Sequence, residues 1–146
     1  LHYVICGEGP DMPFLQKLTR QLHLEERVHL LGYRTDIPDM LGAADIFCMP
    51  SRREGCGMAA LEAMAAGLPL ITVRSHGTKT YAEKGESGFC LKGDLVTSCA
   101  DAIEQLADNK LLRRQMGARN RAAATAFSDA DRMMLLRGYY QKALGD

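Results

Sequence analysis

Two patterns of apolar residues alternate along the first two thirds of the chain. Short apolar runs predict strands, and segments with apolar residues at every third or fourth position predict helices. The predicted strands are Tyr3–Cys6, Val28–Leu31, Ile46–Met49, Leu70–Val73 and Phe89–Leu91. The predicted helices between them are Met12–His23, Ile37–Ala43, Met58–Ala66 and a short piece near Thr78–Lys84. This alternation is typical of βαβ units that build a parallel sheet.

The predicted strands are apolar on both faces, as expected where helices cover both sides of a sheet. From Leu95 onward the pattern is wholly helical, with predicted helices at Leu95–Ala107, Lys110–Ala126 and Asp129–Leu144. A length of 146 residues suits one domain of ordinary size. The predicted fold class is therefore α/β. It is a Rossmann-like, doubly wound parallel sheet of five or six strands with C-terminal helices, in a single domain over residues 1–146.

The charge, the cysteines and the apolar stretches of the chain limit its possible partners and its location in the cell. The 18 basic and 18 acidic residues cancel, so no overall field draws the chain to nucleic acid. Five cysteines, none in a C-x-x-C pair, indicate reduced thiols in the cytoplasm rather than a metal or redox motif. The most apolar stretch is broken by Gly67 and Pro69, and no signal peptide is visible. Because the chain opens inside a predicted strand with no initiator Met, we expect it to be a fragment of a longer protein.

Ligands of open α/β sheets bind beyond the carboxyl ends of the strands. Three Gly-rich segments follow predicted strands at that edge: Gly7-Glu8-Gly9-Pro10, Gly55-Cys56-Gly57 and Ser75-His76-Gly77. These segments are the candidate ligand loops.

The second of these loops combines an anion site with two carboxylates. Gly55 and Gly57 permit close approach of a ligand, and the helix that starts near Gly57 offers its N–H groups to an anion. Glu54 lies just before that helix and Glu62 in its second turn. Carboxylates repel a phosphate but accept hydrogen bonds from hydroxyls on either side of a diphosphate. The arrangement predicts a nucleotide-sugar site.

The segment from Pro50 to Pro69 resembles the signature of the group-1, or family-four, retaining glycosyltransferases. Its pattern is P-S-x-x-E-G-x-G-x-x-x-x-E-A-M-A-x-G-x-P. Similar segments along essentially the whole chain are Gly7–Pro10, Leu31–Tyr33, Ala44-Asp45, Glu86–Phe89, Met116–Arg119 and Ala126–Ser128. The resemblance implies the C-terminal, donor-binding domain of an enzyme with two Rossmann-like domains.

The resemblance also implies roles for individual residues. Glu54, the catalytic candidate, would bond the donor-sugar hydroxyls, and Glu62 would bond the ribose. The diphosphate and sugar would be held by the N–H groups of Gly55, Cys56, Gly57 and Met58. Tyr33 and Arg34 would lie near the base, with Gly7 and Gly9 facing the same crevice. His76 would donate to phosphate or sugar, or is simply solvated in its loop. No metal or cofactor is expected.

The implied partners are a nucleotide sugar, most often a UDP-sugar, and a polysaccharide or lipid-linked acceptor. The acceptor would bind the N-terminal domain, which the chain lacks together with the first strand and helix of its own domain. Retaining hexosyl transfer would therefore be an activity of the full-length enzyme. That enzyme could also associate peripherally with a membrane. The isolated chain is expected to be inactive.

Several other interpretations of the sequence stay open. The chain could be a non-catalytic nucleotide-binding fragment, or part of a sugar-phosphate epimerase or phosphorylase on the same fold. Gly55 to Ala60 also fits the dinucleotide pattern G-x-G-x-x-A, although residues 50–54 separate its first glycine from the strand. Asp129-Ala130-Asp131 resembles a D-x-D metal motif, but Ser128 and Asp131 suit a helix N-terminus better.

Overall fold

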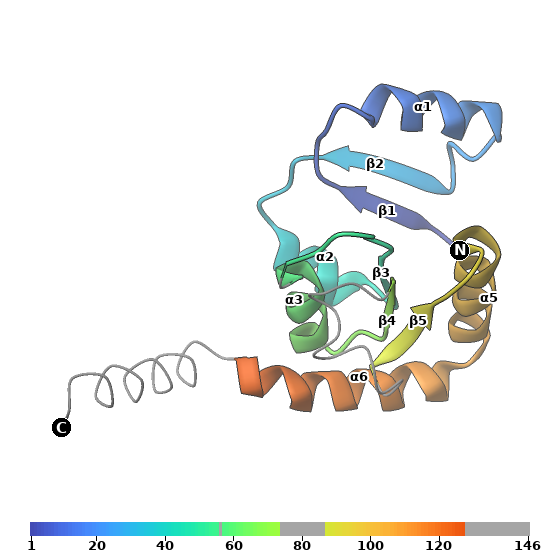
Figure 1. Cartoon of the computed structure of the whole chain (residues 1–146). Coiled ribbons are helices and arrows are strands. Elements are labelled where there is room, and N and C mark those ends of the chain that lie inside the picture. The colour runs from blue at the N-terminus through green and yellow to red at the C-terminus, as the bar shows by residue number, and fades with distance from the viewer. Residues whose placement is uncertain (56, 74–86, 128–146) are drawn as a thin grey trace. The chain divides into compact units, whose positions relative to one another are not determined.

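The computed structural model describes residues 1–55, 57–73 and 87–127 (Figure 1). The elements, in chain order, are β1 Tyr3–Cys6, α1 Met12–Gln21, β2 Val28–Gly32, α2 Ile37–Ala43, β3 Phe47–Met49, α3 Met58–Ala66, β4 Leu70–Val73, β5 Gly88–Leu91, α5 Leu95–Asp108, α6 Lys110–Ala124 and the 3-10 turn η1 Thr125–Phe127. The helices predicted at residues 78–84 and 129–144 lie outside the described residues. The α/β class with parallel strands is confirmed.

The described strands form two parallel sheets, whereas the sequence predicts one sheet of five or six strands. β1 pairs with β2, and β3, β4 and β5 pair in that order. The chain divides into two compact units, Leu1–Asp39 and Met40–Asp146, each with its own sheet. Strands that are apolar on both faces reveal their own positions but not which edges pair, so the pattern of apolar residues does not detect this division.

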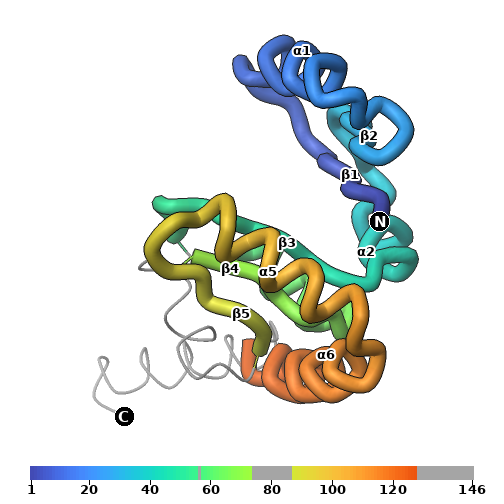
Figure 2. Tube along the Cα trace, turned by 90° about the vertical axis from the view of Figure 1, so that its right-hand side faces the viewer, coloured from blue at the N-terminus to red at the C-terminus, as the bar shows by residue number. Residues whose placement is uncertain are grey.

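The first unit is one βαβ motif, with α1 connecting two parallel strands (Figure 2). Its register pairs Tyr3 with Val28 and shifts between Ile5 and Cys6, so that Cys6 pairs with Gly32. The helix begins at a proline-containing first turn and ends two residues earlier than predicted. His23, with a φ of 53°, has a left-handed conformation that stops it.

The second unit has helices on both faces of its three-stranded sheet, as the doubly wound pattern predicts. One apolar cluster packs α3 on the sheet through Leu61, Met64 and Leu70, with Phe47 and Met49 of β3 against it. The other packs α5 on the opposite face through Leu106, Leu91 and Ile71. Figure 1 shows α3 and α5 on either side of the strands and α6 running beneath them.

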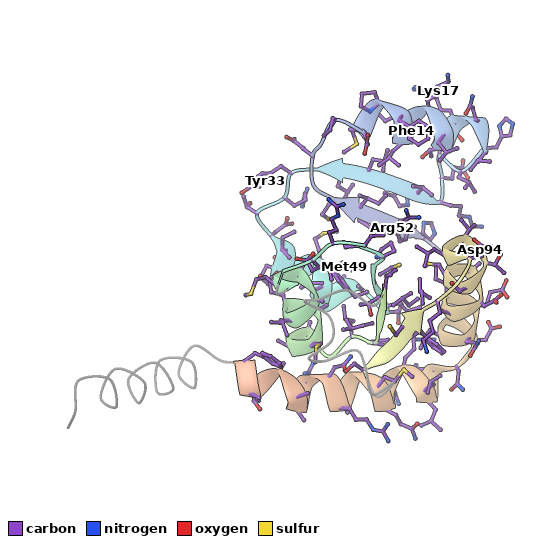
Figure 3. All side chains as sticks on the ribbon, in the orientation of Figure 1. Phe14, Lys17, Tyr33, Met49, Arg52 and Asp94 are labelled. Atoms are coloured by element: carbon purple, nitrogen blue, oxygen red, sulfur yellow. The ribbon has the colours of Figure 1, made fainter. Side chains whose placement is uncertain are left out.

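Side chains close both ends of α5. Asp94, labelled in Figure 3, accepts hydrogen bonds from the backbone N–H groups of Val96 and Thr97. A further bond from the Thr97 hydroxyl, at 2.6 Å, is the main cause that lowers the pKa of the Asp94 carboxyl. At the other end, Arg113 of α6 donates to the carbonyls of Leu106 and Ala107. These contacts satisfy N–H and C=O groups that a helix leaves unpaired at its ends.

A buried amide joins α6 to the amino ends of β4 and β5. The side chain of Asn120 is fully buried, and its Nδ2 donates to the carbonyl oxygens of Leu68 at 2.6 Å and Ser87 at 2.8 Å. Leu68 lies two residues before β4, and Ser87 directly precedes β5. Asn120 therefore fixes the strand edge opposite to the one at which ligands of such sheets bind.

Two glycines allow α6 to approach the end of α3. A Cβ added to Gly117 would lie 2.0 Å from the carbonyl oxygen of Gly67, so no side chain fits there. Gly67 ends α3 in the left-handed region, with a φ of 82°. Arg121, one turn after Gly117, donates to the carbonyl of Ala66 at 2.7 Å. The close helix contact thus depends on the absence of a side chain at residue 117.

Gly117→Ala is expected to destabilise the chain by about 2 kcal/mol, measured by urea denaturation. The new methyl group would force α6 away from a backbone oxygen, at a cost greater than the roughly 1 kcal/mol of helix propensity that alanine gains over glycine. Ala118→Ser, at the exposed neighbouring position, is the matched control and should change stability by less than about 0.5 kcal/mol. Equal stabilities of the two variants would contradict the close approach.

Candidate functional site

The loop between β3 and α3 lies at the carboxyl edge of the three-stranded sheet. Phe47, Cys48 and Met49 pair in parallel with residues 70–72 of β4, so both strands end at the same edge. Figure 3 labels Met49 at the end of β3 and Arg52 in the loop that follows. The loop reaches α3 through Gly57, whose φ of 66° and ψ of 49° are left-handed. This conformation favours glycine because a Cβ would crowd the backbone.

The Glu54 side chain folds back over the amides of its own loop. Its Oε1 accepts hydrogen bonds from the N–H groups of Gly55, at 3.1 Å, and Gly57, at 3.3 Å. Gly57 is the N-cap residue of α3, so the carboxylate lies at the positive end of that helix. In this structure the two amides therefore already bind an anionic group, which the chain itself supplies.

α3 presents Glu62 to solvent and buries the residues beside it. Ala60, Leu61, Ala63 and Met64 are buried, whereas Glu62 is exposed. The exposed carboxylate lies on the fifth residue of the helix, in its second turn as predicted. Met58, at the first helical position, is 52% exposed. The helix is thus fixed by its apolar face and leaves one acidic side chain available near its start.

The two Gly-containing loops of the first unit are joined by Glu8. The N–H of Gly7 donates to the carbonyl of Gly32 at 2.7 Å, and the N–H of Tyr33 donates to Oε1 of Glu8 at 3.4 Å. The predicted residues Gly7, Gly9, Tyr33 and Arg34 therefore come from neighbouring loops at the carboxyl edge of β1 and β2. From the sequence, Glu8 is either a turn residue only or part of a loop that faces the predicted ligand crevice. Its position between two glycines at a strand end is the one signal that could have suggested the contact.

Tyr33 and Arg34 differ in how available their side chains are. Tyr33 is 73% exposed and lies beyond the end of β2 (Figure 3). The Arg34 guanidinium makes a two-point contact with the carboxylate of Asp36, including a bond from Nε at 2.8 Å. The hydrogen bond and charge of Asp36 raise the pKa of Arg34, and the hydrogen bond from Arg34 lowers the pKa of Asp36. A ligand would thus meet Tyr33 directly but would compete with Asp36 for Arg34.

Two predicted site residues, Cys56 and His76, lie outside the described residues. Within residues 1–55, 57–73 and 87–127, no group of three His, Cys, Asp or Glu side chains is arranged to hold a metal ion. No helix in the described part of the chain is long and apolar enough to cross a membrane.

The chain is similar to enzymes that transfer sugars. Residues 1–123 match the family described as "Glycosyl transferases group 1". The chain is 35% identical over 119 residues to the N-acetyl-alpha-D-glucosaminyl L-malate synthase of Bacillus anthracis, a match that covers 81% of this chain and 31% of that protein. It is also 35% identical over 111 residues to the UDP-Gal:alpha-D-GlcNAc-diphosphoundecaprenol alpha-1,3-galactosyltransferase of Escherichia coli, over 75% of this chain and 29% of that one.

A solved structure supports the same fold. The pneumococcal O-GlcNAc transferase GtfA, in complex with UDP and GlcNAc, superposes with a TM-score of 0.87 at 23% identity. The match covers 100% of this chain and 30% of that one. The chain thus spans about a third of the length of the relatives it matches. With the predicted Glu54–Glu62 motif inside the matched residues, the chain belongs to the group 1 glycosyl transferases.

Proposed function

We propose that this chain forms the nucleotide-sugar-binding part of a retaining hexosyltransferase that uses a UDP-sugar. The observation that carries the proposal is the loop from Glu54 to Gly57, whose amides already bind a carboxylate at the N-terminus of α3. Amides that bind one anion in this geometry suit a diphosphate oxygen equally well. The UDP in the GtfA complex supports the choice of nucleotide.

Binding of the donor requires the Glu54 carboxylate to leave the two amides. Each N–H makes one strong hydrogen bond, and the carboxylate would repel a diphosphate at the same place. Two unit charges about 4 Å apart repel by roughly 1 kcal/mol in water and by more at lower dielectric. The diphosphate therefore accepts the hydrogen bonds from the N–H groups of Gly55 and Gly57. The displaced Glu54 carboxylate accepts hydrogen bonds from hydroxyl groups of the donor sugar. Glu62, which is exposed one helical turn after Met58, accepts hydrogen bonds from the ribose hydroxyls.

The remaining donor contacts follow the family resemblance. The backbone of Cys56 and Met58 completes the diphosphate cradle, and His76 donates to phosphate or sugar. Tyr33 and Arg34 serve the base, with Gly7 and Gly9 leaving room beside them. The exposure of Tyr33 fits a base contact, whereas Arg34 must first leave Asp36 if its guanidinium is to take part.

The transfer itself belongs to the longer enzyme. The bond between C1 of the sugar and the β-phosphate oxygen breaks, and C1 bonds to the acceptor oxygen on the same face. The leaving phosphate takes the acceptor proton, so neither a metal nor a cofactor is needed. The chain's amides stabilise the charge that develops on the nucleoside diphosphate. In this proposal another part of the longer enzyme binds the polysaccharide or lipid-linked acceptor at the cytoplasmic side of a membrane. We therefore expect the chain alone to bind donor weakly and to turn none of it over.

Addition of UDP to the 15N-labelled chain should shift the backbone amides of Gly55, Gly57 and Met58, together with Glu62. The diphosphate replaces the Glu54 carboxylate at the loop, and the ribose meets the exposed face of α3. The measurement is a series of amide correlation spectra at increasing UDP. Shifts confined to other segments would refute the assigned site.

Glu54→Gln and Glu62→Gln should affect different steps in the longer enzyme. Glu62→Gln weakens UDP binding about tenfold or more, because it loses charge-assisted hydrogen bonds to the ribose. Glu54→Gln slows transfer about tenfold to a hundredfold and leaves UDP affinity unchanged or slightly higher, because the competing charge is gone. Calorimetry with UDP and kcat for the donor separate the two effects. Glu104→Gln, an exposed acidic position on α5, controls for the change of charge. Equal and negligible effects of both site variants would overturn the roles.

Gly57→Ala is expected to destabilise the chain by about 1 kcal/mol, because it places a Cβ in the left-handed region. Gly55→Ala is the matched control in the same loop, since Gly55 is not left-handed and has nothing within 4 Å of an added Cβ. Thermal unfolding of both variants measures the difference. Equal unfolding temperatures of the two variants would contradict the left-handed conformation of Gly57, on which the orientation of the loop amides depends.

A further inference from the structure

Two thiols far apart in the sequence lie close together on the face of the sheet opposite to α3. The Sγ atoms of Cys48, in β3, and Cys99, in α5, are 3.7 Å apart although 51 positions separate the residues. Both side chains are half-buried. They belong to the apolar cluster that packs α5 on the sheet, on the face opposite to α3.

The positions of both cysteines follow from the packing. Successive residues of a strand point to opposite faces, so Phe47 and Met49 pack toward α3 while Cys48 packs toward α5. On α5, Cys99 lies four residues after Leu95 and four before Ile103, which places all three on the face that covers the sheet. The contact is therefore set by the core and not by freely rotating surface side chains.

We propose that Cys48 and Cys99 form an oxidisable dithiol site that a low-molecular-weight disulfide converts to an intramolecular disulfide. A disulfide bond is about 2.05 Å long, so the two sulfurs must approach by roughly 1.6 Å, which side-chain rotation with small shifts of the helix can provide. This site is separate from the proposed donor site and does not depend on it.

The reaction is a two-step thiol–disulfide exchange. One cysteine thiolate attacks a sulfur of oxidised glutathione, forms a mixed disulfide and releases one glutathione thiolate. The second cysteine thiolate then attacks the protein sulfur of that mixed disulfide and releases the other. The protein loses two electrons and two protons, and the oxidant is reduced to two thiols.

The disulfide would close residues 48–99 into a covalent loop. That loop contains the Glu54–Gly57 segment, α3 and β4, while the crosslink itself lies on the α5 face. Crosslinking residues this far apart in sequence restricts the unfolded chain, so the oxidised form should resist unfolding.

The test uses a variant of the chain that retains only these two cysteines, with Cys6→Ser, Cys56→Ser and Cys90→Ser. Incubation with oxidised glutathione should remove two hydrogens from the mass and join the tryptic peptides 35–52 and 93–110. Tm should rise by about 5 °C and return to the starting value with dithiothreitol. Cys99→Ser in the same background is the control, and it should stop at a mixed disulfide with no rise in Tm.

The same peptide mapping on the chain with all five cysteines keeps the test valid if the variant folds poorly. There the joined peptides 35–52 and 93–110 should again be the main crosslink. The proposal is overturned if both thiols remain open to alkylation after oxidation. It is also overturned if each carries its own glutathione, or if Cys48 and Cys99 crosslink only to other cysteines.

Discussion

The second unit depends on one buried side-chain amide. Asn120 bonds the carbonyls that precede β4 and β5, and it does so from a helix that approaches α3 closely enough to exclude a side chain at Gly117. A buried carbonyl without a donor costs about 1–3 kcal/mol. Asn120 donates to the carbonyl of Leu68, and it adds a second donor to the carbonyl of Ser87, which also accepts from the N–H of Leu70 at 3.0 Å. Oδ1 of the same side chain is buried without a hydrogen-bond partner, so the contacts of this amide with the strand ends are made through its Nδ2 group.

This arrangement separates the part of the sheet that provides stability from the part that we propose binds ligand. The amino ends of the strands are held by Asn120 and by the packing of α6. The carboxyl end of β3 leads into the loop of Glu54, Gly55 and Gly57, where the backbone is shaped by a left-handed glycine and a carboxylate. A packed and hydrogen-bonded amino edge suits the proposed exchange of one anion for another at the amides of the opposite edge, because binding groups work best on a well-supported element.

Local features were predictable from the sequence, whereas long-range polar contacts were not. The bounds of β1, α3 and β4 agree with the prediction, because apolar runs and the left-handed Gly67 mark them directly. The motif from Glu54 to Glu62 also identified the family correctly. Asn120 looks like an ordinary polar residue of a helix surface, because its partners lie 52 and 33 positions away. The hydrogen bonds from the loop amides to Glu54 were equally unpredictable, because the spacing of the motif does not show which acceptor these amides bind.

The hydrogen bonds of Glu54 also bear on how the loop discriminates among the anions of a cell. Inorganic phosphate or sulfate would have to expel the carboxylate and leave it facing water with no new partner. A sugar nucleotide offers the expelled carboxylate hydroxyl groups in return, so only a ligand that carries both chemical groups compensates for the exchange. A side chain that covers its own binding loop would in this way act as a filter against the simplest and most abundant competitors.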